Sequence, residues 1–261
     1  MWSPWRGCHR FSEGCRHCYI HKGDARRGVD TNRIVRSDRF DAPIVRKKNG
    51  EYRMAGGQIV YLCFQSDFLL EEADAWRGAC WDIIRERGDL MFLFLTKRIG
   101  RFMDCVPPDW GEGYENVIVG CTVENQKNAD ERLSRFADLP IRHKNIICQP
   151  MLERMDIERY LPGVELVVAG GESDREARPL DYDWVLDLRE QCRRAGTHFE
   201  FRQCGTHFIK DGKMYTLQVK DLCAQARKAG INLLGEIAAD AWPLHIGRRC
   251  IIIGASFTKG V

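Results

Sequence analysis

The chain has 261 residues, 44% of them hydrophobic, and a formal net charge of +3. These values fit one large globular domain or two small ones, and they permit a nucleic-acid partner without requiring one. The longest apolar runs, such as MFLFL at 91–95, are too short to span a bilayer, and no secretory signal opens the chain. We therefore expect a cytoplasmic protein with no membrane partner. In that reducing compartment its 12 cysteines are expected to be thiols or metal ligands rather than disulfides.

Three cysteines crowd the start of the chain, in the stretch CHRFSEGCRHCY. Cys8, Cys15 and Cys18 have the spacing C-x6-C-x2-C. A structural zinc ion takes four ligands and a disulfide framework needs an even number of cysteines, so three thiols leave either arrangement incomplete. A zinc site stays open as an alternative, with its fourth ligand drawn from His9, His17, His21, Cys204 or His207.

The segment that follows, at about 20–57, is polar, basic and only weakly periodic. We interpret it as an insertion, with a hairpin around Asn49-Gly50. Its basic residues fit either a solvated face or a surface for an anionic partner; they are Arg26, Arg27, Arg33, Arg36, Arg46, Lys47 and Lys48.

Strand-like and helix-like segments alternate beyond residue 58. The strand-like runs are 58–67, 90–98, 116–125, 144–153, 164–173 and 198–205, and helical periodicity marks 72–88, 126–140 and 181–196. Continuous apolar strands that alternate with helices indicate a parallel sheet covered by helices. With a further strand at the N-terminus, the pattern predicts an α/β fold: a partial (β/α) TIM-like barrel of about six to seven parallel strands. We expect a single domain over 1–261, with a C-terminal extension at about 206–261 that holds a hairpin, a helix and a last apolar run at 250–257.

Polar residues gather where the predicted strands end. In parallel barrels this edge of the sheet is where sites are built, so we interpret them as the mouth of a ligand site rather than as unrelated helix caps. The residues are Ser66, Asp67, Thr96, Lys97, Arg98, Thr122, Glu124, Asn125, Gln149, Glu172, Ser173, Arg202 and Gln203.

The chemistry of the three cysteines favours an iron–sulfur cluster. Soft thiolates select zinc, Cu(I) or iron–sulfur clusters, and electron-transfer clusters are held by four cysteines. A [4Fe–4S] cluster on Cys8, Cys15 and Cys18 leaves one iron open to a substrate or cofactor. The amino and carboxylate groups of S-adenosylmethionine (SAM) suit that iron, and electron transfer to the sulfonium then yields methionine and a 5′-deoxyadenosyl radical that abstracts hydrogen.

These motifs carry a resemblance. WSPWRGCHRFSEGCRHCY, SDFLLEE, FLFLTKR, VGCTVENQKNADERL, VVAGGESDREARP, DWVLDLREQC and FRQCG occur in order over residues 2–205. In these the chain resembles a phage-associated, radical-SAM-like family of unknown function with a three-cysteine motif. More distantly, the C-x2-C-Tyr, Ser-Asp…Glu and Thr-Lys elements look like the DNA repair photolyase and spore photoproduct lyase group of radical SAM enzymes.

The resemblance implies a radical SAM barrel with the cluster on the three cysteines and SAM in the mouth. It assigns Ser66 and Asp67 to the SAM amino group, with Glu71 or Glu72 as substitutes. Thr96 and Lys97 end the neighbouring strand. Thr122, Glu124 and Asn125 would line the ribose or methionine side, and Arg132 would pair with the SAM carboxylate.

Several positions depart from these patterns or stay ambiguous. The first cysteine gap has six residues where radical SAM enzymes most often have three. Gln149 stands where the family usually has an acid, and Cys204 where it tends to have tryptophan. Cys204 is a candidate hydrogen-atom donor, a second-cluster ligand or a plain core thiol. Glu172, in AGGES, is expected in the site, and Arg178 is either an anion ligand or a surface arginine.

We therefore expect a radical SAM enzyme that uses an electron donor such as flavodoxin or ferredoxin. The photolyase-like motifs and the basic segment favour a nucleic acid or nucleotide as substrate. The alternatives are a zinc-binding nucleic-acid-binding protein without catalysis, and a SAM-binding protein that has lost its chemistry.

Overall fold

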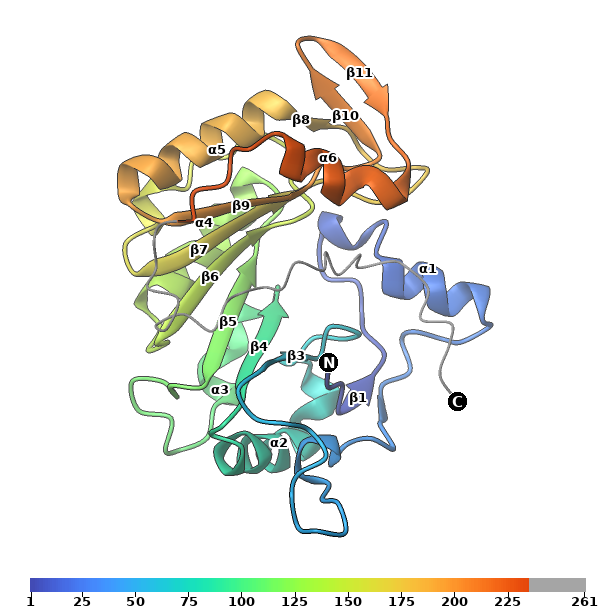
Figure 1. Cartoon of the computed structure of the whole chain (residues 1–261), viewed down its shortest axis with the longest axis vertical. Helices are drawn as coiled ribbons and strands as arrows, with labels where there is room; N and C mark the ends of the chain where they lie inside the picture. Colours follow the sequence, from blue (N-terminus) through green and yellow to red (C-terminus); the bar gives the residue numbers. More distant parts are fainter. Residues whose placement is uncertain (235–261) are drawn as a thin grey trace.

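The computed structural model describes residues 1–234, and a parallel sheet of six strands forms its centre (Figure 1). The strands lie in the order β3-β4-β5-β6-β7-β9, every neighbouring pair is parallel, and the sheet is curled into a half-barrel. All six predicted strands are present, as β3 (Ile59–Leu62), β4 (Met91–Thr96), β5 (Val117–Thr122), β6 (His143–Cys148), β7 (Val164–Gly170) and β9 (His198–Gln203).

Helices connect successive strands, as the alternating pattern predicts. The three long predicted helices are confirmed as α2 (Asp74–Glu86), α4 (Gln126–Asp138) and α5 (Tyr182–Ala195), and the short α3 (Phe102–Cys105) lies between β4 and β5. Asn125 caps α4 by accepting a hydrogen bond from the amide of Asn128, and Gly196 ends α5 with a φ of 69°. Ser173, which also suits an N-cap, begins no helix, because the chain runs on to the short strand β8 (Leu180–Asp181).

Alternation along the strands separates the two faces of the sheet. Phe92, Phe94 and Val119 belong to the large core shared with α2, α4 and α5. Leu95 and Ile147 face the other way, into a small apolar cluster with Leu166 and Val168. The helices therefore cover one face, while the opposite face is left to build a cavity.

The N-terminal segment does not add a seventh strand. β1 (Trp5–Arg6) pairs antiparallel with β2 (Val35–Arg36), and only a single parallel bridge joins Trp2 to Leu62 of β3. Trp5 is fully buried and stacks on Phe68, with ring centroids 5.4 Å apart. This anchoring places the cysteines, and α1 (Tyr19–Arg26) after them, beside the carboxyl ends of the strands (Figure 1).

The region after β9 confirms the predicted hairpin and helix. β10 (His207–Lys210) and β11 (Lys213–Thr216) pair antiparallel, and Asp211 and Gly212 both adopt positive φ in the turn, as a tight hairpin requires. α6 (Leu222–Lys228) then packs on β9. The predicted apolar run at 250–257 lies outside the described residues. Within residues 1–234, no helix combines the length and apolar character needed to cross a membrane.

Candidate functional site

A cavity of about 210 Å³ opens at the carboxyl ends of the strands, and all three motif cysteines line it. Ten of the predicted strand-end residues line the same cavity: Ser66, Asp67, Thr96, Lys97, Arg98, Thr122, Gln149, Glu172, Ser173 and Gln203. Leu95 and Ile147 form part of its wall, together with Gln203 at the end of β9. Residues from the N-terminal loop and from the carboxyl ends of all six central strands therefore meet at one place.

Backbone contacts shape the loop that carries the thiols. The amide of Cys8 donates to the carbonyl of Thr31 at 2.8 Å, which fixes the start of the loop against the chain before β2. The amide of Phe11 donates to Sγ of Cys15 at 3.5 Å. Cys18 precedes α1, in the N-cap position. Each thiol is thus held by its own piece of local structure.

Burial favours the protonated thiols of Cys8 and Cys18 in the absence of a metal. It raises the pKa of Cys8 to about 12, and Asp67 adds to the rise. Burial also raises the pKa of Cys18, although the amides of Ile20 and His21 in the first turn of α1 act in the opposite direction. A metal that binds these sulfurs displaces their protons, so binding and deprotonation are coupled.

The separation of the sulfurs bears on which metal fits. A tetrahedral zinc ion with Zn–S bonds of about 2.3 Å holds its sulfur ligands roughly 3.8 Å apart. Among residues 1–234, one group of three potential metal ligands has all its donor atoms within 4.8 Å of one another. This group is His17, Asp174 and Glu176, and it does not include the cysteines. The three cysteine sulfurs therefore do not form a group as close as a single tetrahedral ion requires.

A fourth cysteine, Cys63, also lines the cavity. It follows β3 with a φ of 55°, is 1% exposed and belongs to the large core. Burial is the main cause that raises the pKa of Cys63, and the next is the neighbouring thiol of Cys80 in α2. Its thiol is therefore associated with the core beneath α2, which leaves the N-terminal trio as the distinct set.

Asp67 organises two strand ends. Its carboxylate accepts hydrogen bonds from the hydroxyl of Thr96 at 2.8 Å, the amide of Leu69 at 2.9 Å and the amide of Lys97 at 3.3 Å. The guanidinium of Arg98 pairs with it at 3.0 Å. Four protein donors occupy this carboxylate, so Asp67 positions the cavity wall and the predicted contact to the SAM amino group has no free oxygen position.

The residues after β5 hold the cysteine loop from outside the cavity. The fully buried carboxylate of Glu124 accepts from the amide of Gly14 at 3.1 Å and pairs with Arg132 at 2.8 Å. The side-chain amide of Asn125 donates to the carboxylate of Glu13 at 2.8 Å. The long first gap of the cysteine motif is thereby explained, because its extra residues dock on the end of β5.

Four predicted site residues accordingly have other roles or other places. Glu124, Asn125 and Arg132 do not line the cavity. Arg132 is 4% exposed, and its guanidinium donates hydrogen bonds to the Glu124 carboxylate and to the carbonyl of Thr122. A carboxylate in the cavity is therefore beyond its reach. Glu71 is exposed and lies 3.7 Å from Arg101, away from the cavity.

Glu172 and Arg178 form a pair at the opposite rim. Arg178 donates to the Glu172 carboxylate from its Nε at 3.1 Å and from its backbone amide at 2.8 Å, and its guanidinium also donates to the carbonyl of Glu13 at 2.9 Å. Arg178 is therefore a partner of Glu172 at the rim, and neither of its two predicted roles, an anion ligand or a plain surface arginine, is tested by these contacts. Glycines permit the tight crossing behind it: a Cβ on Gly171 would lie 2.8 Å from the Cα of Gly205.

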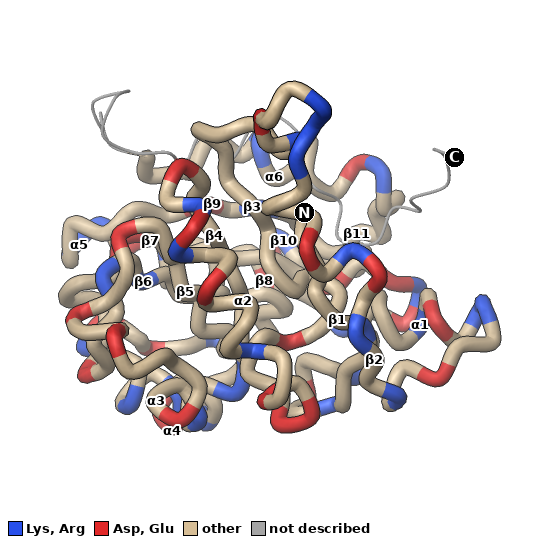
Figure 2. The backbone as a smooth tube through the Cα atoms, turned by 90° about the horizontal axis from the view of Figure 1, so that it is seen from below, with Lys and Arg blue, Asp and Glu red and all other residues tan. Residues whose placement is uncertain are grey.

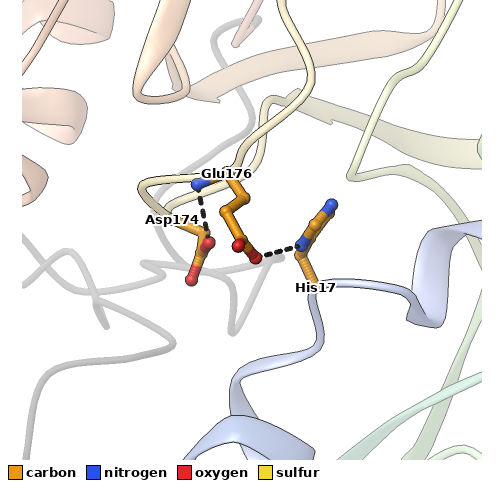
Figure 3. A group of neighbouring side chains, drawn as sticks. All are labelled: His17, Asp174 and Glu176. Atoms are coloured by element: carbon orange, nitrogen blue, oxygen red, sulfur yellow. Dashed lines mark hydrogen bonds and ion pairs between the residues drawn. The ribbon is translucent and has the colours of Figure 1, made fainter.

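Ionic contacts connect α1 with the loop after β7. The ammonium of Lys22 lies 2.6 Å from the carboxylate of Asp174 and 3.2 Å from that of Glu176. Figure 3 shows His17 beside the same two acids, with its Nδ1 3.8 Å from the Glu176 carboxylate. The Lys22 ammonium already pairs with both acids, so we interpret the group as a latch rather than as a metal site. We call Lys22, Asp174 and Glu176 the rim latch.

Cys204 does not line the cavity. It is 3% exposed, its amide donates to the carbonyl of Leu222 near α6, and burial raises its pKa to about 12. This position fits the core-thiol interpretation and places no hydrogen donor at the cavity. Lys22 was missed from the sequence, because its role depends on Asp174, 152 residues away. Arg98 was predicted at a strand end, but its pairing with Asp67, 31 residues away, was not.

Comparison with known proteins places the chain in a family without a known role. The profile described as "Protein of unknown function (DUF5131)" matches residues 1–243. The chain belongs to this DUF5131 family. No curated protein and no solved structure matches it. The function of this DUF5131 protein has therefore to be argued from its own site.

Proposed function

We propose that this DUF5131 protein is a radical SAM enzyme that holds a [4Fe–4S] cluster on Cys8, Cys15 and Cys18. The observation that carries the proposal is the convergence of these three thiols with the carboxyl ends of a parallel half-barrel on one cavity. When bound, the cluster would supply reductive cleavage of SAM and so a 5′-deoxyadenosyl radical for hydrogen abstraction.

The residues around the cavity suit a zwitterionic ligand. Lys97 lines the cavity, and its ammonium makes no hydrogen bond or ion pair within residues 1–234. We assign to it the ligand carboxylate that the sequence had assigned to Arg132. Ser66, Thr122 and Gln149 add neutral polar groups at neighbouring strand ends, while the charge of Glu172 is compensated by Arg178.

The same arrangement makes it possible to exclude water from the chemistry. The rim latch and the Arg178 contact to Glu13 bring the loop after β7 against the cysteine loop. Leu95 and Ile147 form an apolar part of the wall. Shielding of this kind is what the protein contributes to a radical reaction, alongside positioning. Electrons would come from a flavodoxin or ferredoxin.

Anaerobic reconstitution tests the proposal directly. The chain is purified without oxygen, supplied with iron and sulfide, and examined by absorption and EPR spectroscopy with and without SAM. We expect about four irons per chain, an EPR spectrum that changes on addition of SAM, and 5′-deoxyadenosine after reduction. Colourless protein that holds one zinc per chain and ignores SAM would establish the alternative of a zinc-binding protein, against which the spacing of the sulfurs already counts.

A further inference from the structure

Positive charge is concentrated in the part of the chain that carries the cysteines. Residues 1–39 contain nine Lys and Arg against four Asp and Glu, a net charge of +5, whereas the remaining residues contain 31 against 33, a net charge of −2. The small overall charge thus hides a separation between the cysteine segment and the rest of the molecule. Eight of these nine cations are arginines.

Most arginines elsewhere on the surface are paired with acids, whereas most of those near the cysteines are not. Arg85, Arg159 and Arg193 each lie within 2.8 Å of a carboxylate. Near the cysteines, five exposed arginines have no ion pair in the part of the chain that the structure describes: Arg6, Arg10, Arg16, Arg33 and Arg36. We call these five the arginine face.

The fold brings the arginine face to the edge of the cavity. Arg10 and Arg16 lie within the cysteine motif itself. Arg33 comes beside it because the carbonyl of Thr31 accepts from the amide of Cys8. Arg6 and Arg36 lie on the paired strands β1 and β2, where the guanidinium of Arg36 lies over the ring of Phe40. Figure 2 marks Lys and Arg positions along β1, β2 and α1. By contrast, Arg46 and Lys47 of the predicted basic insertion lie 3.7 and 3.1 Å from Glu86 and Glu51, so they do not belong to this set.

We infer that the arginine face binds the phosphate backbone of a nucleic acid and presents one of its nucleotides to the cavity. This inference rests on the proposed function, since it names the substrate class of the same site. A cavity of about 210 Å³ accepts a group of small-molecule size, so the rest of a polymer must lie across its rim.

The residue types favour a nucleic acid over an acidic polypeptide. The planar guanidinium pairs bidentately with phosphate and is used for nucleic-acid recognition in preference to lysine. Phe11, half exposed, follows Arg10 in the cysteine loop. Aromatic rings among arginines are the elements on which single-stranded bases stack. An acidic polypeptide would pair with the arginines, but it has no bases to stack on the Phe11 ring.

Fluorescence anisotropy with labelled strands of about 20 nucleotides tests this inference on the reconstituted protein. Single-stranded DNA, single-stranded RNA and duplex DNA form three arms, and polyglutamate is the competitor. The test variant is R10Q/R16Q/R33Q. The control, R159Q/R193Q/R194Q, removes the same total charge from arginines that are ion-paired elsewhere on the surface.

We expect at least one strand type to bind with a steep dependence on salt. The test variant should bind it about tenfold or more weakly, with a slope of log Kd against log salt lower by about 2, while the control changes less than about twofold. Absence of binding to all three strands, equal losses in the two variants, or full displacement by an equal charge of polyglutamate would overturn the inference. The 5′-deoxyadenosine assay separates the outcomes, because cluster-loaded protein that cleaves SAM without binding a strand contradicts only this inference.

Discussion

Glu124 and Gly14, 110 residues apart in the chain, are joined by a hydrogen bond of 3.1 Å between the glycine amide and the buried carboxylate. Arg132 pairs with the same carboxylate from behind, at 2.8 Å. The contact sets how closely the cysteine loop approaches the end of β5, one residue before Cys15. The position of the cysteine loop is thereby controlled from the half-barrel.

Replacement of Gly14 tests this control. A Cβ at this position would lie 3.1 Å from Cδ and 3.2 Å from Oε1 of Glu124, so Gly14→Ala must push the loop outward. We expect iron content after reconstitution to fall several-fold while the Glu124–Arg132 pair stays intact. Gly78→Ala is the matched control, because no atom lies within 4 Å of the added Cβ; helix propensity should make that variant more stable by up to about 1 kcal/mol. Normal iron content in Gly14→Ala would remove this role from the contact.

The four cysteines of the cavity should differ in their effect on iron content. Cys8→Ala, Cys15→Ala and Cys18→Ala each remove a proposed ligand and should abolish the cluster spectrum and the formation of 5′-deoxyadenosine. Cys63→Ala should retain iron, because that thiol belongs to the core beneath α2. The substitution should lower the free energy of unfolding by about 1–3 kcal/mol, because a buried group is lost. Denaturant unfolding measures this change. Loss of iron in Cys63→Ala would instead make the site a four-cysteine one.

Much of this site could be predicted from the sequence, because parallel strands bring their carboxyl ends to one edge. The apolar runs that end in Ser66-Asp67, Thr96-Lys97 and Thr122 identified the edge correctly. The side-chain roles were harder to predict. Asp67 and Arg132 looked like ligand contacts, yet both are consumed by protein partners. The end of a predicted strand indicates where a side chain lies. It does not indicate whether a residue far away in the sequence already pairs with that side chain.

The N-terminal strand shows the same limit for the fold. Trp2 and Trp5 lie in an apolar stretch that suits a first barrel strand, and Trp2 does form one parallel bridge to Leu62. The chain then leaves the sheet to form β1, which pairs with β2 from the polar segment. Pairing between a two-residue strand and a partner 30 residues later leaves no periodic signal in the sequence.

Lys97 is predicted to bind the carboxylate of SAM. Removal of a charge-assisted hydrogen bond costs about 1.5–3 kcal/mol, so Lys97→Ala should weaken SAM binding by roughly 10- to 150-fold. Lys97→Arg should recover part of the loss. Isothermal titration calorimetry on reconstituted protein measures both, with the exposed Lys127→Ala as the control. SAM affinity in Lys97→Ala equal to that of the control would leave the carboxylate without its assigned partner.

His143, at the start of β6, makes stability depend on pH. Its hydrogen bond to Glu165, at 2.9 Å, raises the pKa of His143 above the ordinary value of 6.5, against the effect of burial. A raised pKa in the folded state stabilises the protein below pH 6.5, and this contribution is lost as the pH rises through the folded-state value. The Tm difference between the wild type and His143→Gln should therefore be greatest in mild acid and shrink towards alkaline pH. A difference that grows with pH would contradict the assignment.

The rim latch is predicted to control access to the thiols. Lys22 spans from α1 to Asp174 and Glu176 across the rim, whereas Arg27 of the same region pairs only with Asp24 nearby. Lys22→Gln should free the loop after β7, so a maleimide should label Cys15 and Cys18 of the metal-free protein several-fold faster. Arg27→Gln is the control and should leave the rate unchanged. Screening by 1 M salt, where the Debye length is about 3 Å, should accelerate labelling of the wild type but not of Lys22→Gln. Equal rates in the two variants at low salt would mean that the loop stays closed through Arg178 alone.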